Sequence, residues 1–290
     1  MAITAAMIKE LRERTGAGMM DCKNVLVESN GDIDLAIEVL RKRGAAAAEK
    51  KAGRIAAEGI IASARDDSAS VLVEINSETD FVAKDDSFKA FASAVANAAL
   101  TNDVADVEGL AGVAIEGGTT VEEARQALIA KIGENISVRR FEKILAGEGG
   151  VSSYLHGNRI GVLVKLSTVG EELGRDIAMH IAASKPLCIS ENEMDGSVLE
   201  KEKEIFEAQA ADSGKPAEII EKMVSGRIRK FLKENTLLGQ PFVKNTDQTV
   251  ADLLKASGAS VMHMTRFEVG EGMEKRSDDF VAEVMAQAGA

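Results

Sequence analysis

Cysteine and histidine are scarce in this sequence, and their scarcity excludes several kinds of site. The two cysteines, Cys22 and Cys188, lie far apart and fit neither a disulfide framework nor metal-ligand spacing. The three histidines, His156, His180 and His263, fall in separate predicted elements, so no pair has the spacing of zinc ligands. We therefore expect two reduced cysteines that serve in packing, and no bound metal.

Long apolar runs and an excess of basic residues are also missing. No run is apolar and long enough to span a bilayer, and residues 1–4 lack the basic-then-apolar layout of a signal peptide. Acidic residues number 47 against 35 Lys and Arg, a formal charge of −12, whereas duplex nucleic acid needs a basic surface opposite its phosphates. We expect a soluble, cytoplasmic chain with a protein partner, without membrane or direct nucleic-acid binding.

Motifs of catalysis and of cofactor binding are absent as well. Gly16-Ala17-Gly18 lacks the third glycine of a dinucleotide fingerprint, and Ser213-Gly214-Lys215 has no glycine at the spacing of a phosphate-binding loop. His180, alone on an amphipathic helical pattern, has the setting of a structural histidine. The sequence therefore predicts no cofactor and no enzyme.

Alternating and helical patterns predict an α+β fold in which one plan occurs twice. Strands 60–64 and 71–76, helices after residue 84 and near 121–132, and strand 136–143 form the first copy. Strands 151–156 and 159–167, helix 171–184 and strand 261–269 form the second. Arg140-Phe141-Glu142 and Arg266-Phe267-Glu268 occupy equivalent places. We infer two similar hairpin-helix-strand subdomains.

Helical segments precede and interrupt these copies. Residues 4–40 hold three short helical patterns that resemble the ubiquitin-associated fold. A capping box, Ser197 to Glu200, is expected to open a helix to about Asp212, and apolar residues from Ile219 to Phe231 mark a second helix. Two such striped helices predict an antiparallel hairpin that pairs with another subunit or a partner domain. Phe280, Val281, Val284 and Met285 predict a short final helix.

These patterns divide the chain of 290 residues into six parts. We expect a three-helix module at 1–43, a part-helical linker without an apolar face at 44–54, a first core subdomain at 55–146, a second core subdomain at 147–189 and 236–272, a helical hairpin at 190–235, and a C-terminal helical module at 273–290.

The stretch from Glu74 to Lys84 holds an aromatic residue where a polar turn is expected. Val71, Val73 and Ile75 alternate as in a half-buried strand, and Asp85 can cap the helix that follows, so Asp80 and Phe81 lie on the connection. Binding residues concentrate on such loops, because rigid elements fix them while the backbone stays at the surface. Phe81 is either an exposed anchor or a plug that folds back onto the local core.

Four motifs resemble those of the translation elongation factor Ts family, in that family's order along the chain. They are Leu11 to Leu26, Glu74 to Lys84, Ile177 to Pro186, and Arg266 to Gly272. The resemblance implies a guanine-nucleotide exchange factor whose partner is the GTPase elongation factor Tu. It further implies that Thr79, Asp80, Phe81 and Val82 contact the partner and dislocate its Mg²⁺, with further contacts from Arg12, Met19, Met20 and His156.

Some alternatives remain open on the sequence. Methionines suit adaptable contact surfaces but occur more often in cores, and we expect Met19 and Met20 to point one inward and one outward. The helical hairpin serves as a dimer contact in some members of the family, so a homodimer is possible here. A non-exchange adaptor associated with ribosomes or chaperones is the main alternative function. Another is RNA binding through the basic stretch Arg41 to Arg54, which is more simply a solvated tether.

Overall fold

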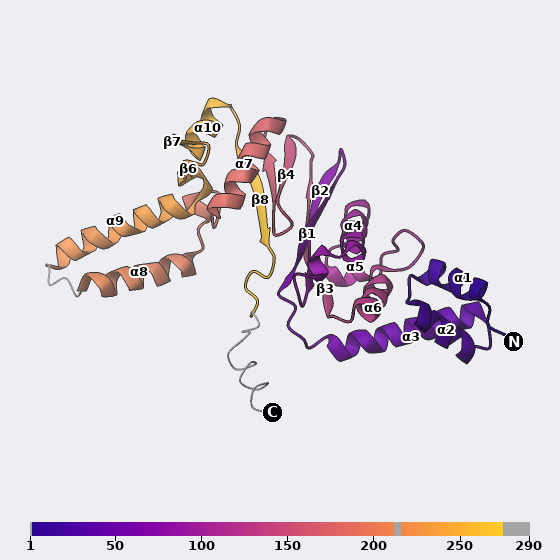
Figure 1. Cartoon of the computed structure of the whole chain (residues 1–290). Coiled ribbons are helices and arrows are strands. Elements are labelled where there is room, and N and C mark those ends of the chain that lie inside the picture. The colour runs from indigo at the N-terminus through magenta and orange to yellow at the C-terminus, as the bar shows by residue number, and fades with distance from the viewer. Residues whose placement is uncertain (1, 212–215, 275–290) are drawn as a thin grey trace. The chain divides into compact units, whose positions relative to one another are not determined.

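The computed structural model describes residues 2–211 and 216–274, and the chain forms two compact units (Figure 1). Unit 1 contains the chain up to Arg65, Val71–Lys143 and the described residues after Arg266. Unit 2 contains Asp66–Ser70 and Ile144–Arg266. Among the described residues, no helix is both long and apolar enough to cross a membrane. The predicted C-terminal helix, with Phe280, Val281, Val284 and Met285, lies outside the described residues.

Three helices begin unit 1: α1 (Ala5–Thr15), α2 (Met19–Glu28) and α3 (Ile33–Lys51). The Thr4 hydroxyl accepts a hydrogen bond from the Met7 amide and caps α1, while Asp32 caps α3 through the Leu35 amide. Fully buried side chains from all three helices form the core of this module: Leu11, Cys22, Val25, Leu26 and Ala36. Burial raises the pKa of the Cys22 thiol, which keeps this packing cysteine protonated.

The predicted linker is mostly helix, and it has a buried face. α3 continues without a break to Lys51, and Gly44 and Ala48, one turn apart, are buried against the rest of unit 1. This half of α3 packs along α6 (Val121–Ile132). The expectation that this stretch lacks an apolar face was wrong, because glycine and alanine form a packing surface through close approach rather than through large side chains.

A three-stranded sheet is the centre of unit 1. Its order is β1 (Glu58–Arg65), β2 (Ala69–Ser77) and β3 (Ile136–Leu145), and every residue of the central strand β2 is buried. α4 (Asp86–Thr101) packs on β1, and its Phe88, Ala92 and Val95 are fully or almost fully buried, as their spacing predicted. The short α5 (Val107–Ala111) precedes α6 and lies within residues 101–120, for which the sequence patterns predict no element.

Unit 2 repeats the plan with β4 (Gly150–His156), β5 (Ile160–Leu166), α7 (Glu171–Ser184) and β8 (Val261–Glu268). The sheet order β4-β5-β8 matches β1-β2-β3 in arrangement, and β4 pairs antiparallel with β5, Tyr154 opposite Val162. α7 covers the sheet closely, since a Cβ atom built on Gly174 would lie 2.0 Å from the Ser152 Oγ. The predicted α+β fold with two similar subdomains is confirmed.

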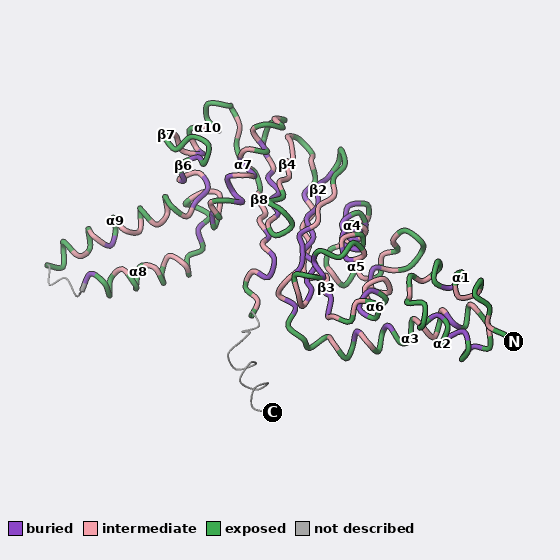
Figure 2. Tube along the Cα trace, in the orientation of Figure 1, coloured by how far each residue is buried: buried purple, intermediate pink, exposed green. Residues whose placement is uncertain are grey.

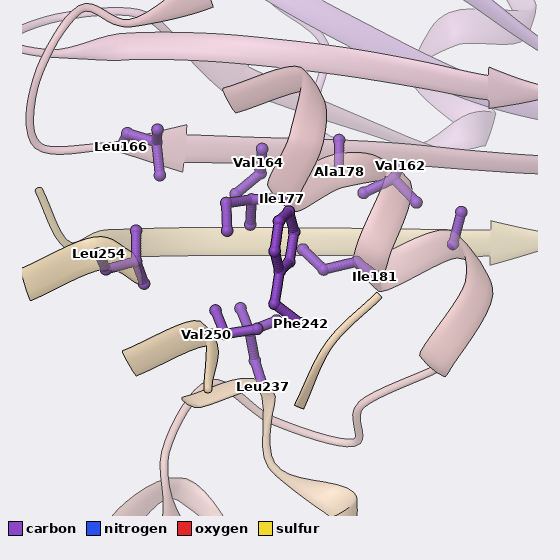
Figure 3. Packing of buried hydrophobic residues seen from close by; sticks show 11 residues of the cluster. Val162, Val164, Leu166, Ile177, Ala178, Ile181, Leu237, Phe242, Val250 and Leu254 are labelled. Atoms are coloured by element: carbon purple, nitrogen blue, oxygen red, sulfur yellow. The ribbon is translucent and has the colours of Figure 1, made fainter. Parts of the chain in front are cut away.

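The core of unit 2 also includes side chains from the later segment 237–254. Figure 3 shows Ile177 and Ile181 of α7 meeting Phe242 and Leu237 beside Val162 and Val164 of β5. Phe242 lies in a small second sheet made of β6 (Pro241–Phe242) and β7 (Asn245–Thr249), which α10 (Val250–Ala256) follows. These short elements were not predicted individually, because they are too short to show a period.

The predicted helical hairpin follows α7 and precedes β6 in the sequence. It consists of α8 (Gly196–Ala211) and α9 (Ala217–Asn235). The two helices contact each other and are largely exposed (Figure 2), with Ile205 and Ile219 each 46% exposed. The helix start differs from the expected capping box. Asp195 accepts a hydrogen bond from the Ser197 amide at 2.7 Å, so the helix begins before Ser197.

Candidate functional site

The connection from β2 to α4 is a short turn that is fixed at its far end by a helix cap. Asp85 accepts hydrogen bonds from the amides of Ser87 (2.8 Å) and Phe88 (3.1 Å), as its position predicted. These hydrogen bonds hold the pKa of the Asp85 carboxyl below its usual value. A single 3-10 turn, Val82–Lys84, fills the space before the cap. We call residues Thr79–Val82 the Phe81 turn.

Glu134, from the loop after α6, holds the near end of the Phe81 turn. Its carboxylate accepts two hydrogen bonds from Thr79, one from the backbone amide at 3.0 Å and one from the hydroxyl at 2.8 Å. The same hydroxyl accepts a longer hydrogen bond from the Val82 amide at 3.4 Å. Thr79 thus helps to fix the turn, because both its amide and its hydroxyl form hydrogen bonds within the chain.

A second set of contacts lies directly beside the first. The Asn135 amide donates to the Glu78 carboxylate at 2.6 Å, and Arg54 approaches the same oxygen at 3.4 Å. The Asn135 side chain in turn donates to the backbone oxygens of Arg54 (2.9 Å) and Ala52 (3.4 Å). The segment that follows α3 is therefore connected to the base of the Phe81 turn.

Sequence reasoning missed Glu134 and Asn135, although a local signal was present. Gly133 ends α6 in the left-handed conformation, with φ of 90°, and it is followed by two polar residues before β3. A polar pair between a helix cap and a strand indicates a loop with side chains available for bonding. The sequence gives no means of knowing that this loop meets Thr79.

Phe81 is 78% exposed, which excludes the plug. The residues that follow it, Val82 and Ala83, are buried and turn inward beneath the loop. The Lys84 ammonium lies 5.7 Å from the centre of the Phe81 ring and 2.6 Å from the Asp80 carboxylate. An exposed ring with one charge pair beside it therefore projects from a backbone that is fixed on both sides.

The other predicted contacts in unit 1 form an exposed patch on the three-helix module. Met19 and Met20, in the first turn of α2, are 61% and 63% exposed, and Arg12 on α1 is exposed as well. The expectation that one methionine points inward was wrong, because Cys22, Val25 and Leu26 already fill the core side of α2. Val27, two turns further along the helix, is also exposed and was not predicted. We call Arg12, Met19 and Met20 the N-terminal patch.

His156 belongs to unit 2, whereas the other predicted contact residues belong to unit 1. It is exposed at the end of β4, opposite Ile160, beside a tight turn. Its Nδ1 lies 3.2 Å from the Tyr154 hydroxyl, and the two rings are 6.3 Å apart between centroids. The imidazole therefore has one neighbour that orients it and a surface that is open to solvent.

His180, by contrast, is a structural residue, as predicted. It is fully buried on α7, where its Nδ1 accepts a hydrogen bond from the Val243 amide at 3.2 Å. Its Nε2 lies 2.9 Å from Gln240 Oε1, to which it must therefore donate. Burial lowers the pKa of His180 and favours the neutral ring. In the part of the chain that the structure describes, no cluster of three or more His, Cys, Asp or Glu residues is placed to hold a metal ion.

A family model described as elongation factor TS matches residues 78–271, about two thirds of the chain. The chain belongs to the elongation factor Ts family. Similar relatives include elongation factor Ts of Thioalkalivibrio sulfidiphilus, 58% identical over 99% of both chains, and of Methylococcus capsulatus, 58% identical over 100% of both. Elongation factor Ts of Legionella pneumophila is 56% identical over 98% of both chains.

The match to the elongation factor Ts model begins just before the Phe81 turn and ends within the Arg266 to Gly272 motif, at residue 271. His156 lies within the match, and the N-terminal patch precedes it. The relatives nevertheless span the whole chain, so the three-helix module also has counterparts in elongation factor Ts proteins. The chain is thus an elongation factor of protein biosynthesis.

Proposed function

We propose that this member of the elongation factor Ts family is a guanine-nucleotide exchange factor for elongation factor Tu. The observation that carries the proposal is the Phe81 turn, on which an aromatic ring is 78% exposed while Glu134 and the Asp85 cap fix the backbone on either side. A ring held in this way loses little conformational freedom on binding, so more of its contact energy is available to the complex.

Phe81 then acts as a wedge in the partner. A GTPase holds GDP through backbone amides and a Mg²⁺ ion that requires near-ideal octahedral geometry. Inserting the ring between elements beside that site displaces the ion and lowers the affinity for GDP. Asp80 makes polar contacts next to the ring, whereas Thr79 and Val82 keep the turn in shape. No covalent step is needed.

The required free energy is within reach of these contacts. Release of GDP a thousandfold faster needs about 4 kcal/mol of differential binding, at about 1.4 kcal/mol for each factor of ten. Buried aromatic anchors supply about 2 kcal/mol or more in many interfaces. The N-terminal patch supplies a second contact, and we assign His156 a third. Thermodynamic linkage requires that bound nucleotide weaken the factor's own affinity equally.

We further propose the hairpin α8–α9 as the surface through which two copies of the chain would associate. Its two helices expose Ile205 and Ile219 and cover each other on one side only. Sedimentation equilibrium of the wild type and of an Ile205→Glu, Ile219→Glu variant tests this. A dimer that becomes a monomer in the variant supports the proposal, and a monomeric wild type overturns it.

Stopped-flow release of a fluorescent GDP analogue from elongation factor Tu tests the exchange proposal. We expect the wild type to accelerate release and Phe81→Ala to reduce the maximal rate at least tenfold, corresponding to about 1.4 kcal/mol. The melting temperature should change little, because the ring is exposed.

A matched control is Val169→Ala, which removes another strongly exposed apolar side chain, in unit 2. It should leave the rate unchanged. Equal acceleration by the wild type and Phe81→Ala would move the wedge elsewhere, with His156→Ala as the next variant. If the wild type binds elongation factor Tu without accelerating release, the chain is a non-exchange adaptor.

A further inference from the structure

Helix α3 packs with two different parts of unit 1. Its first half contributes Ala36 to the core of the three-helix module. Its second half packs along α6 through Gly44, and Ala48 is buried on the same face. One continuous helix therefore runs from the module that carries the N-terminal patch to the helix that precedes Glu134.

The backbone of α3 approaches the backbone of α6 at Gly44. A Cβ atom built on Gly44 would lie 3.4 Å from the Gln126 backbone oxygen and 3.7 Å from the Ala127 nitrogen. Alanine would fit at this position in ordinary contact with α6, whereas a longer side chain would crowd the backbone of Gln126 and Ala127. Arg41, one turn before Gly44, forms an ion pair with Glu123 of α6. We call this contact the α3–α6 crossing.

The same path continues to the Phe81 turn through short, directed contacts. α6 ends at Gly133, and the next two residues are Glu134 and Asn135, which bind Thr79 and Glu78. Asn135 also binds the backbone of Ala52 and Arg54, just beyond the end of α3. Both helices of the crossing are thus connected to the base of the turn.

We propose that the α3–α6 crossing fixes the N-terminal patch relative to the Phe81 turn, so that a partner meets both as one preorganised two-part surface. The inference rests on the proposed function for the identity of the partner, but not for the rigidity. It assigns Gly44 as a positioning residue, which acts through α6 without touching the partner. Two contacts held at a fixed separation raise the effective concentration of the second once the first has formed.

Replacing Gly44 by leucine disturbs the α3–α6 crossing without weakening helix α3 itself. Leucine is a better helix former than glycine, so α3 itself is not weakened, whereas the carbon atoms beyond its Cβ crowd the Gln126 backbone that the Cβ already contacts. Gly44→Ala is the matched control at the same position.

Rigidity is measured first, without any partner. Spin labels at Lys9→Cys on α1 and Thr101→Cys at the end of α4, both exposed, report the distance between the module and the core in a Cys188→Ser background. We expect one narrow distance distribution in the wild type and in Gly44→Ala, and a broad one in Gly44→Leu. A broad distribution in the wild type, or an equally narrow one in Gly44→Leu, overturns the proposal.

Function is measured second, as GDP release against factor concentration. For Gly44→Leu we expect the concentration that gives half-maximal release to rise about tenfold or more, and to change more than the maximal rate does, because Phe81 itself and the Asp85 cap are unchanged. An unchanged half-maximal concentration in Gly44→Leu overturns the proposal. If the wild type fails to accelerate GDP release, only the proposed exchange function is wrong. The proposal for the α3–α6 crossing is then still tested, by the distance measurement.

Discussion

His180 illustrates at the scale of one residue how burial determines chemistry. Both ring nitrogens are occupied, by the Val243 amide and the Gln240 side chain, and the surrounding core favours the neutral ring. The sequence predicted this role from a lone histidine on an apolar helical face. It gave no means of identifying Gln240, which lies 60 residues away in the chain.

We expect this histidine to make the stability of unit 2 depend on pH. Its pKa is lowered in the folded protein, so below about pH 6.5 the unfolded chain binds a proton that the folded chain does not. Stability should therefore be unaffected by this group above pH 6.5 and fall as the pH is lowered, by up to about 1.4 kcal/mol per pH unit. Urea unfolding at pH 8, 7, 6 and 5.5 measures it.

The matched variant is His180→Gln. It should be less stable throughout but should show a flatter pH dependence than the wild type. Parallel curves for the wild type and His180→Gln would contradict the expectation, because they would mean that His180 takes up its proton equally in both states.

At the scale of elements, periodicity predicted the helices and hairpins but not the contacts between them. The spacing of apolar residues correctly placed three helices and the two β-hairpins: α4, α6, α7, β1–β2 and β4–β5. The packing face on the second half of α3 was not predicted, because Gly44 and the alanines after it form no stripe of large apolar side chains. Small side chains are nevertheless what a close helix crossing needs. The turn that presents Phe81 was predicted, whereas its support from Glu134 depends on a contact across 55 residues.

Removal of Glu134 should loosen the Phe81 turn without removing the ring. In Glu134→Ala the amide and hydroxyl of Thr79 lose their acceptor, so the turn gains freedom that binding must remove again. We expect about tenfold weaker acceleration of GDP release, which corresponds to about 1.4 kcal/mol. Fluorescence stopped flow measures the rate, and amide hydrogen exchange of residues 79–82 should rise in parallel.

Glu116→Ala is the control for this change, because Glu116 is an exposed glutamate of the same unit. It should match the wild type in both measurements. If Glu134→Ala slows exchange while the protection of residues 79–82 stays intact, Glu134 acts on the partner directly and the support of the turn is not its role.

At the scale of the whole molecule, a buried carboxylate on β2 joins segments of unit 1 that lie far apart in the sequence. Glu74 on β2 is fully buried and contacts Arg139 (3.0 Å) and Arg140 (2.6 Å) of β3. It also accepts a hydrogen bond from the Gly270 amide at 2.8 Å, across 196 residues. Gly270 has φ of 70°, and its backbone approaches Ala57 so closely that a built Cβ would lie 2.2 Å from the Ala57 oxygen.

Neutralising this carboxylate should destabilise unit 1. Glu74→Gln leaves two arginines beside a group without charge, and breaking a buried ion pair in this way costs about 3–5 kcal/mol. We expect a lower melting temperature and faster hydrogen exchange at the Gly270 amide. Glu116→Gln, the exposed control, should change neither. A melting temperature within about 2 °C of the wild type would show that the network carries little of the stability.

The contact between Glu74 and Gly270 also has a consequence for the order in which the chain is made. Glu74 leaves the ribosome long before Gly270 is synthesised, and at about 5–20 residues per second the interval is roughly 10–40 s. During that time unit 2, which is made in between, can fold on its own segment of the chain, while β2 and β3 hold a carboxylate and two arginines without their last partner. Unit 1 is the first to begin and the last to be completed.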